Sequence, residues 1–121
     1  MTQCDRFHAL RDGDKRTLMK VRDIIDMFLA IERKMPLIYA RSFIEVALNP
    51  GKGPTTYGSA IGTGQPQMSR ILLEIGPQAR HKQNSLNLVG QVASPNNARE
   101  IQTHLTPAGM TLMYDIIRRM D

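Results

Sequence analysis

Hydrophobic side chains recur every three or four residues through the first part of the chain, a spacing that predicts helices. A first helix is expected over 14–35, with Asp14 as its N-cap and Pro36 closing it or opening the next one. Residues 1–13 are polar and are expected to form a flexible N-terminal segment. The apolar stripe of the first helix consists of Leu18, Val21, Ile25 and Phe28, widened by Ile24, Met27 and Ile31.

A second helix is predicted over 37–48, where apolar residues cover most of the helix circumference. Such a helix usually lies in the middle of a domain. Residues 49–54 then break the chain with two prolines and two glycines. The main apolar face of this helix is expected to carry Leu37, Ala40, Ile44, Ala47 and Leu48, while Phe43 and Val46 extend onto another face.

Two shorter helices follow on either side of the turn Gly62-Thr63-Gly64. The first begins at Thr55 or Thr56 and ends at Ile61, and the second covers about 65–75, where Gly76-Pro77 stops it. The inward residues are expected to be Tyr57, Ala60 and Ile61 in the first, and Met68, Ile71, Leu72 and Ile75 in the second.

Beyond residue 77 the pattern changes from helical to alternating. Residues 88–93 and 99–106 read as two strands joined by turn residues, with Ile101, Thr103 and Leu105 on the buried side of the second. Thr106-Pro107 opens a last helix over 107–120. The predicted fold class is therefore mainly α with a small β-hairpin (α+β), in one domain over 14–121 whose central part is 37–106.

Two short helices with a glycine-containing turn, followed by a hairpin, are the element order of a winged helix-turn-helix. In such a domain the second helix buries one stripe and offers polar side chains at its N-terminal end to DNA. Glutamine can pair with adenine and arginine with guanine, or either can hold a phosphate. Double-stranded DNA is therefore the expected partner, and the candidate contacts on this helix are Gln65, Gln67, Ser69 and Arg70.

The formal net charge of +5 and the pI near 9.8 favour a polyanionic partner, although charge alone identifies none. The single cysteine, Cys4, excludes a disulfide within the chain and fits a reducing compartment. No apolar run approaches the roughly 20 residues that span a bilayer, and the N-terminus lacks the apolar stretch of a signal peptide. A cytoplasmic protein, with no membrane association, is expected.

The sequence contains no recognisable arrangement of catalytic residues and no metal-binding motif. The histidines, His8, His81 and His104, are widely separated, and Gly51-Lys52-Gly53 is too short for a phosphate-binding loop. We therefore expect no enzymatic activity, no metal and no cofactor. One alternative to DNA binding stays open: a winged helix that docks a protein, because the second short helix carries one arginine and an outward Leu73.

Three segments resemble the MarR-type winged-helix transcriptional regulators. Residues 61–72 are similar to that family's turn and recognition helix, where an aliphatic-Gly pair precedes the turn and a Ser-Arg pair lies in the helix. Residues 95–99 resemble its wing tip, and 105–109, Leu-Thr-Pro-Ala-Gly, match its Leu-Thr-x-x-Gly entry to the last helix. The three occur in the family's order, and the resemblance covers roughly 37–120.

The resemblance implies a repressor with N- and C-terminal dimerisation helices, in which two copies read two half-sites about one turn of DNA apart. It implies major-groove contacts from the recognition helix, as above. In the wing it implies a minor-groove or phosphate contact from Arg99, supported by Asn96 and Asn97. The homodimer interface is expected to contain Leu18, Val21, Ile25, Phe28, Met110, Met113, Tyr114 and Ile117.

The chain also departs from the family pattern. Asn97 replaces the usual acid of the wing, which is expected to loosen the tip arginine. The segment 78–87 lengthens the link to the wing, and its Arg80 and Lys82 are candidates for additional phosphate contacts. The chain is short for the family, and no effector site is recognisable. These features fit a ligand-independent regulator in bacterial or phage-host cytoplasm.

Overall fold

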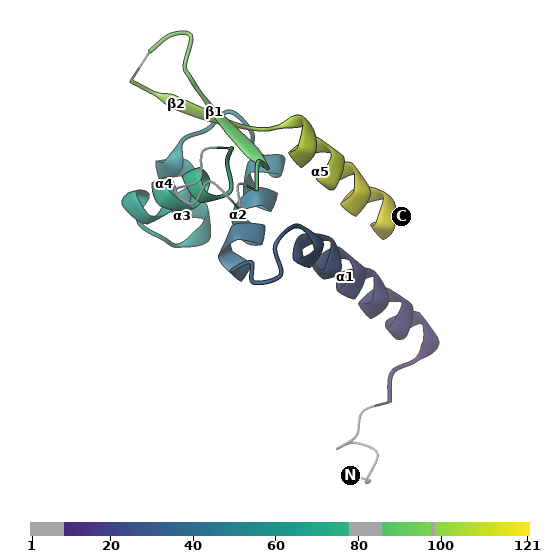
Figure 1. Cartoon of the computed structure of the whole chain (residues 1–121). Helices are drawn as coiled ribbons and strands as arrows, with labels where there is room; N and C mark the ends of the chain where they lie inside the picture. The colour runs from purple at the N-terminus through teal and green to yellow at the C-terminus, as the bar shows by residue number, and fades with distance from the viewer. Residues whose placement is uncertain (1–8, 78–85, 98) are drawn as a thin grey trace.

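The computed structural model describes residues 9–77, 86–97 and 99–121, and these form five helices and one two-stranded antiparallel sheet. The predicted fold class is confirmed (Figure 1). In chain order the elements are α1 (Asp12–Ile31), α2 (Leu37–Leu48), α3 (Pro54–Ile61), α4 (Gln65–Glu74), β1 (Val89–Ala93), β2 (Ile101–Leu105) and α5 (Pro107–Met120).

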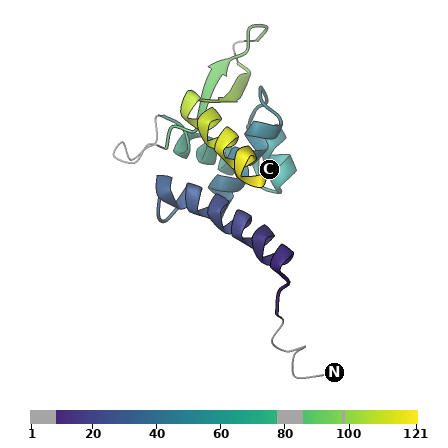
Figure 2. The same cartoon turned by 90° about the vertical axis from the view of Figure 1, so that its right-hand side faces the viewer.

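The elements are arranged in two parts. Helices α2, α3 and α4 pack together under the hairpin, while α1 and α5 extend to one side (Figure 1). A view turned by 90° shows α5 lying above α1, with the hairpin projecting beyond both helices (Figure 2). The terminal helices thus lie beside the winged-helix body and contribute Phe28 of α1 and Leu112 of α5 to its core.

Helix ends follow local chemistry at α5 and differ from the prediction at α1. Thr106 is the N-cap of α5, as predicted, and its side-chain oxygen accepts the Gly109 backbone N–H at 3.0 Å. The prediction of Asp14 as N-cap is wrong: α1 begins at Asp12, and its N-cap Arg11 makes no side-chain capping bond. Asp12 and Asp14 both lie in the first turn, where the helix dipole favours negative charge.

The core lies where α2, α3, α4 and β1 meet. The face predicted for α2 is wrong in most of its residues: Ala40 is buried as predicted, but Phe43 and Val46 are buried with it, while Leu37 is 80% and Leu48 is 75% exposed. The pattern of α2 is apolar nearly all round, so its position among the other elements selects the face. The fully buried side chains of the core include Tyr57, Phe43, Met68, Leu72, Ile75, Val46 and Val89.

The loop before α3 joins the sheet. Lys52 and Thr103 form an antiparallel bridge: the Thr103 N–H donates to the Lys52 carbonyl at 2.9 Å, and the Gly51 N–H to the Thr103 carbonyl at 2.8 Å. The buried Tyr57 hydroxyl donates to the Asn49 carbonyl at 2.7 Å and accepts the Lys52 N–H at 3.2 Å. Burial raises the pKa of Tyr57, which keeps this hydroxyl protonated as a donor. The loop, the hairpin and α3 are thus one hydrogen-bonded unit.

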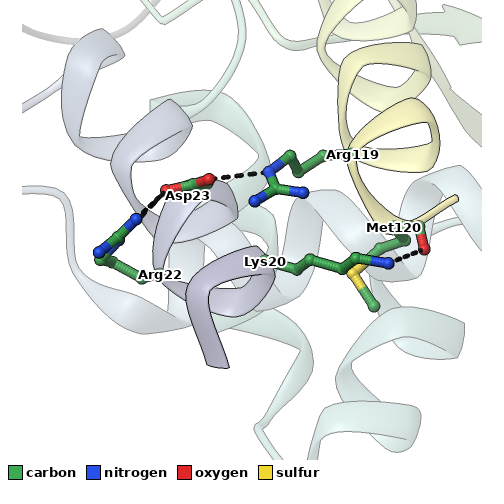
Figure 3. Close-up of polar contacts among 5 residues, drawn as sticks. All are labelled: Lys20, Arg22, Asp23, Arg119 and Met120. Carbon is green, nitrogen blue, oxygen red and sulfur yellow. Dashed lines mark hydrogen bonds and ion pairs between the residues drawn. The ribbon is translucent and has the colours of Figure 1, made fainter. Parts of the chain in front are cut away.

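Polar contacts connect α1 with α5 (Figure 3). Arg119 Nε donates to Asp23 Oδ2 at 2.8 Å, and Lys20 Nζ donates to the Met120 carbonyl at 3.0 Å. The hydrogen bond from Arg119 is the main reason that the pKa of Asp23 is lowered; burial opposes it, and Arg22 adds a smaller effect in the same direction. These contacts fix the end of the chain against the first helix.

Candidate nucleic-acid interface

The turn between α3 and α4 is built from backbone that glycine favours. Gly62 has φ +89°, in the left-handed region, and its N–H closes α3 on the Gly58 carbonyl at 2.8 Å. Gly58 packs against the turn and α4, because a Cβ there would stand 2.7 Å from the Thr63 carbonyl oxygen and 3.5 Å from Met68 Cβ. The two glycines allow α4 to cross closely over α3.

Helix α4 buries the predicted stripe and presents its N-terminal half to solvent. Met68, Ile71 and Leu72 are at most 4% exposed, and Ile75 follows them into the core. Of the predicted contact residues, Gln65, Gln67 and Arg70 are exposed and Ser69 is half-buried. In α3, by contrast, the predicted inward residue Ala60 is exposed and Gly58 is buried in its place.

Gln67 is held by a residue that the sequence reasoning did not identify. The Thr63 hydroxyl donates to Gln67 Oε1 at 2.7 Å, which ties the glutamine side chain to the turn. A capping box, in which a hydroxyl residue precedes a Gln or Glu by three positions, is the related sequence signal. Here the spacing is four, because the N-cap position is occupied by Gly64, so the usual pattern does not reveal the pair.

The other polar residue at the centre of α4 is Arg70, which lies beside α2. Burial raises the pKa of Tyr39 on α2, the charge of Glu74 raises it further, and the charge of Arg70 lowers it. Among the described residues Arg70 has no ion-pair partner, so its guanidinium remains available to a ligand. Leu73, one turn further along this exposed surface, is 51% exposed.

The wing tip is organised by side chains that bind backbone. Asn97 Oδ1 accepts the Arg99 N–H at 3.0 Å, and the Ser94 hydroxyl accepts the Asn96 N–H at 3.3 Å. Asn97 therefore supplies a side-chain acceptor for the backbone of the tip arginine. The predicted wing residues Asn96, Asn97 and Arg99 are all exposed, on the loop that joins β1 to β2.

Arg80 and Lys82, the remaining predicted contacts, lie outside the described residues. Within the described part, α4 carries one cation and one anion, Arg70 and Glu74, and the wing carries Arg99 next to Glu100. The contact surface formed by α4 and the wing is thus close to neutral. This surface is lined by hydrogen-bonding side chains rather than by a dense basic patch.

The residues predicted for a dimer interface divide into two groups. Phe28 is not available for contact with a second copy, because it is 6% exposed and its ring packs edge-to-face on Phe43, with ring centroids 5.8 Å apart. Met113 is half-buried against the core. The other predicted residues are 42–53% exposed on α1 and α5: Leu18, Val21, Ile25, Met110, Tyr114 and Ile117.

A groove of about 670 Å³ lies between α1 and α2. Its walls are apolar apart from Arg41, and they include Phe28, Leu37 and Ile44. No three His, Cys, Asp or Glu side chains gather into a metal-binding group within the described ranges. Within those same ranges, no helix is long and apolar enough to cross a membrane.

Comparison with known proteins identifies the fold. No family model and no curated protein matches the sequence. A crystal structure of a MarR family transcription regulator is similar at a TM-score of 0.55 and 22% identity, over 88% of this chain and 70% of that one. The transcriptional repressor CouR, bound to a 23-mer DNA duplex, is similar at a TM-score of 0.56 and 18% identity, over 98% of this chain and 78% of that one.

A MarR-like transcriptional regulator from Thermotoga maritima is similar at a TM-score of 0.58 and 14% identity, over 92% of this chain and 76% of its own. At these identities the comparison establishes the fold. The chain has the MarR-type winged-helix fold, which confirms the family resemblance of the sequence at the level of structure.

Proposed function

We propose that this chain, with its MarR-type winged-helix fold, is a homodimeric regulator that binds double-stranded DNA at specific sequences and represses transcription by occupying a promoter. The observation that carries the proposal is α4, which buries its apolar stripe completely and exposes Gln65, Gln67 and Arg70. A recognition helix needs this division, since one face must hold it to the domain while the other reaches base edges. The similar fold of a repressor bound to a DNA duplex supports the same conclusion.

The proposed dimer rests on the terminal helices. Leu18, Val21 and Ile25 repeat at helical spacing on α1, and Met110, Tyr114 and Ile117 do so on α5. Each of these side chains is at least 42% exposed. A monomeric protein rarely exposes apolar side chains in a continuous stripe of this kind. A second copy covering both stripes would remove this apolar surface from water.

The test is selection of bound sequences from a pool of random duplex DNA. A palindromic site is expected, since a two-fold dimer reads its half-sites in opposite directions. Placed over a promoter in a reporter strain, that site should lower transcription when the protein is expressed. A pool that yields no enriched sequence would refute sequence-specific binding.

A matched pair of variants tests the role of α4. Arg70→Ala should weaken binding to the selected site by about 1–3 kcal/mol if the guanidinium reads a base. Arg41→Ala, on α2 and paired with Glu45 at 2.7 Å, removes the same charge outside α4 and the wing, and should change affinity much less. Equal effects of the two substitutions would show that α4 contributes only charge.

Protein docking is the second candidate, because Leu73 is 51% exposed on the same helix. The dependence of DNA affinity on salt separates the two functions. Each phosphate neutralised by the protein contributes about −0.9 to the slope of log K against log salt. A slope near zero would indicate that the exposed face of α4 serves a protein partner.

A further inference from the structure

We propose that Thr63 is a positioning residue that makes Gln67 a hydrogen-bond donor to DNA, so that Gln67 selects a base edge presenting acceptors, guanine above all. The inference rests on the proposed function and specifies what one residue of the same surface recognises. It concerns a single contact between the turn and α4, namely the Thr63 hydroxyl on Gln67 Oε1 at 2.7 Å.

The geometry assigns opposite roles to the two ends of the Gln67 amide. Its oxygen points back to the turn, where the Thr63 hydroxyl occupies it. Its Nε2 group has no acceptor among the described residues, and the residue is exposed. Gly64, at the N-cap, has no side chain that could compete for either end. The amide is therefore fixed with its two N–H donors available to a ligand.

The donors and acceptors on the base edges determine which base this orientation of the Gln67 amide favours. Pairing with adenine requires both ends of the glutamine amide, since the oxygen accepts from N6 while the nitrogen donates to N7. The Thr63 hydroxyl takes one of the two lone pairs of that oxygen and ties the amide plane to the turn, so Gln67 pairs with adenine at both ends only where the base lies in that plane. Guanine presents two acceptors, O6 and N7, side by side in the major groove, and cytosine presents a donor. An N–H donor held toward the groove matches guanine best, since either of its two acceptors can take the bond, and cytosine least.

The experiment compares base preferences selected from random duplex DNA by the full chain and three variants. Gln67→Ala identifies the position that Gln67 reads, as the one whose preference disappears. At that position the unmodified protein should select guanine. Thr63→Val keeps the shape of the side chain but releases the oxygen, and should raise the ratio of adenine to guanine about tenfold, within the range a bidentate contact commands. Thr63→Ser retains the hydroxyl and should keep the guanine preference.

The results distinguish a failure of the role of Thr63 from a failure of sequence-specific DNA binding. A recovered site at which Thr63→Val and the unmodified protein show the same preference would overturn the role of Thr63, while DNA binding would stand. Selection of adenine or cytosine by the unmodified protein would overturn it too, as would a Gln67→Ala variant that changes no position. A change in overall affinity without a change in base ratio is what a merely structural role of Thr63 predicts, and it also counts against the proposal. Failure to enrich any sequence would instead refute the proposed function.

Discussion

Gly109 holds α5 against the hairpin, and adding one methyl group there should separate the two. A Cβ on Gly109 would stand 2.1 Å from the Leu88 carbonyl oxygen and 3.1 Å from its carbonyl carbon. The same oxygen accepts the Thr106 N–H at 3.1 Å, immediately before α5 begins. Because the obstacle is backbone rather than the end of a flexible side chain, Gly109→Ala can be accommodated only if the helix or the hairpin moves.

The magnitude follows from two opposing effects. Overpacking in a well-packed region costs about 1–3 kcal/mol, and a contact this short with backbone belongs at the upper end. Alanine is better than glycine within a helix by about 1 kcal/mol, which offsets part of that cost. We expect Gly109→Ala to lower the free energy of unfolding by about 2 kcal/mol, or the melting temperature by roughly 6–10 °C for a domain of this size.

Urea denaturation followed by circular dichroism measures the change, with Gly13→Ala as the matched control. Gly13 also lies in the first turn of a helix, but its Cβ would meet only the tip of Arg16, 3.9 Å away. That control should be neutral or stabilising by up to about 1 kcal/mol. If Gly109→Ala were as stable as the control, α5 would not be seated on Leu88 as described, and the reasoning would be refuted.

Three further predictions concern burial, ionisation and assembly. The Thr103 hydroxyl is buried with no hydrogen-bond partner among the described residues, so Thr103→Val should leave the free energy of unfolding unchanged or raise it by about 1 kcal/mol. Thr106→Val removes an N-cap and should lower the free energy of unfolding by a similar amount. Denaturation curves that show a change of the same sign for both variants would contradict this. Because the hydrogen bond from Arg119 lowers the pKa of Asp23, the carboxylate stabilises the fold above about pH 4 and loses that effect as the pH falls through its folded pKa. Asp23→Asn should therefore reduce stability at pH 7 and have little effect near pH 2, and an equal effect at both values would exclude the ion pair as the cause. Ile117→Asp should shift the sedimentation coefficient from dimer to monomer at micromolar concentration without lowering helix content, and a variant that still sediments as the unmodified protein would remove α5 from the proposed interface.

Local features of the chain were predictable because their causes lie within a few residues. The turn at 62–64, the stripe of Met68, Ile71 and Leu72, and the N-cap at Thr106 all depend on backbone preference or helical period. The motif at 105–109 can also be recognised in the sequence, although part of it is explained by a tertiary contact. Thr106 caps the helix, and Gly109 leaves room for the Leu88 carbonyl.

The candidate site was predictable only in part. Exposed Gln65, Gln67 and Arg70 follow from their position opposite the buried stripe of α4. The hydrogen bond between Thr63 and Gln67 does not follow from the pattern, because it depends on how the turn directs one side chain toward the helix. The proximity of Arg70 to Tyr39 likewise requires the packing of α4 against α2.

The sequence by itself determined the order of helices and strands, the winged-helix class and the polar end of α4, since each of these arises from periodicity and turn chemistry. Only the tertiary structure decided that α2 buries Phe43 rather than Leu37, and that Phe28 belongs to the core rather than to the surface of α1. The physical reason is the same in both cases. A side chain is buried by elements distant in the sequence, and a helix that is apolar on several faces does not specify which of them will be covered.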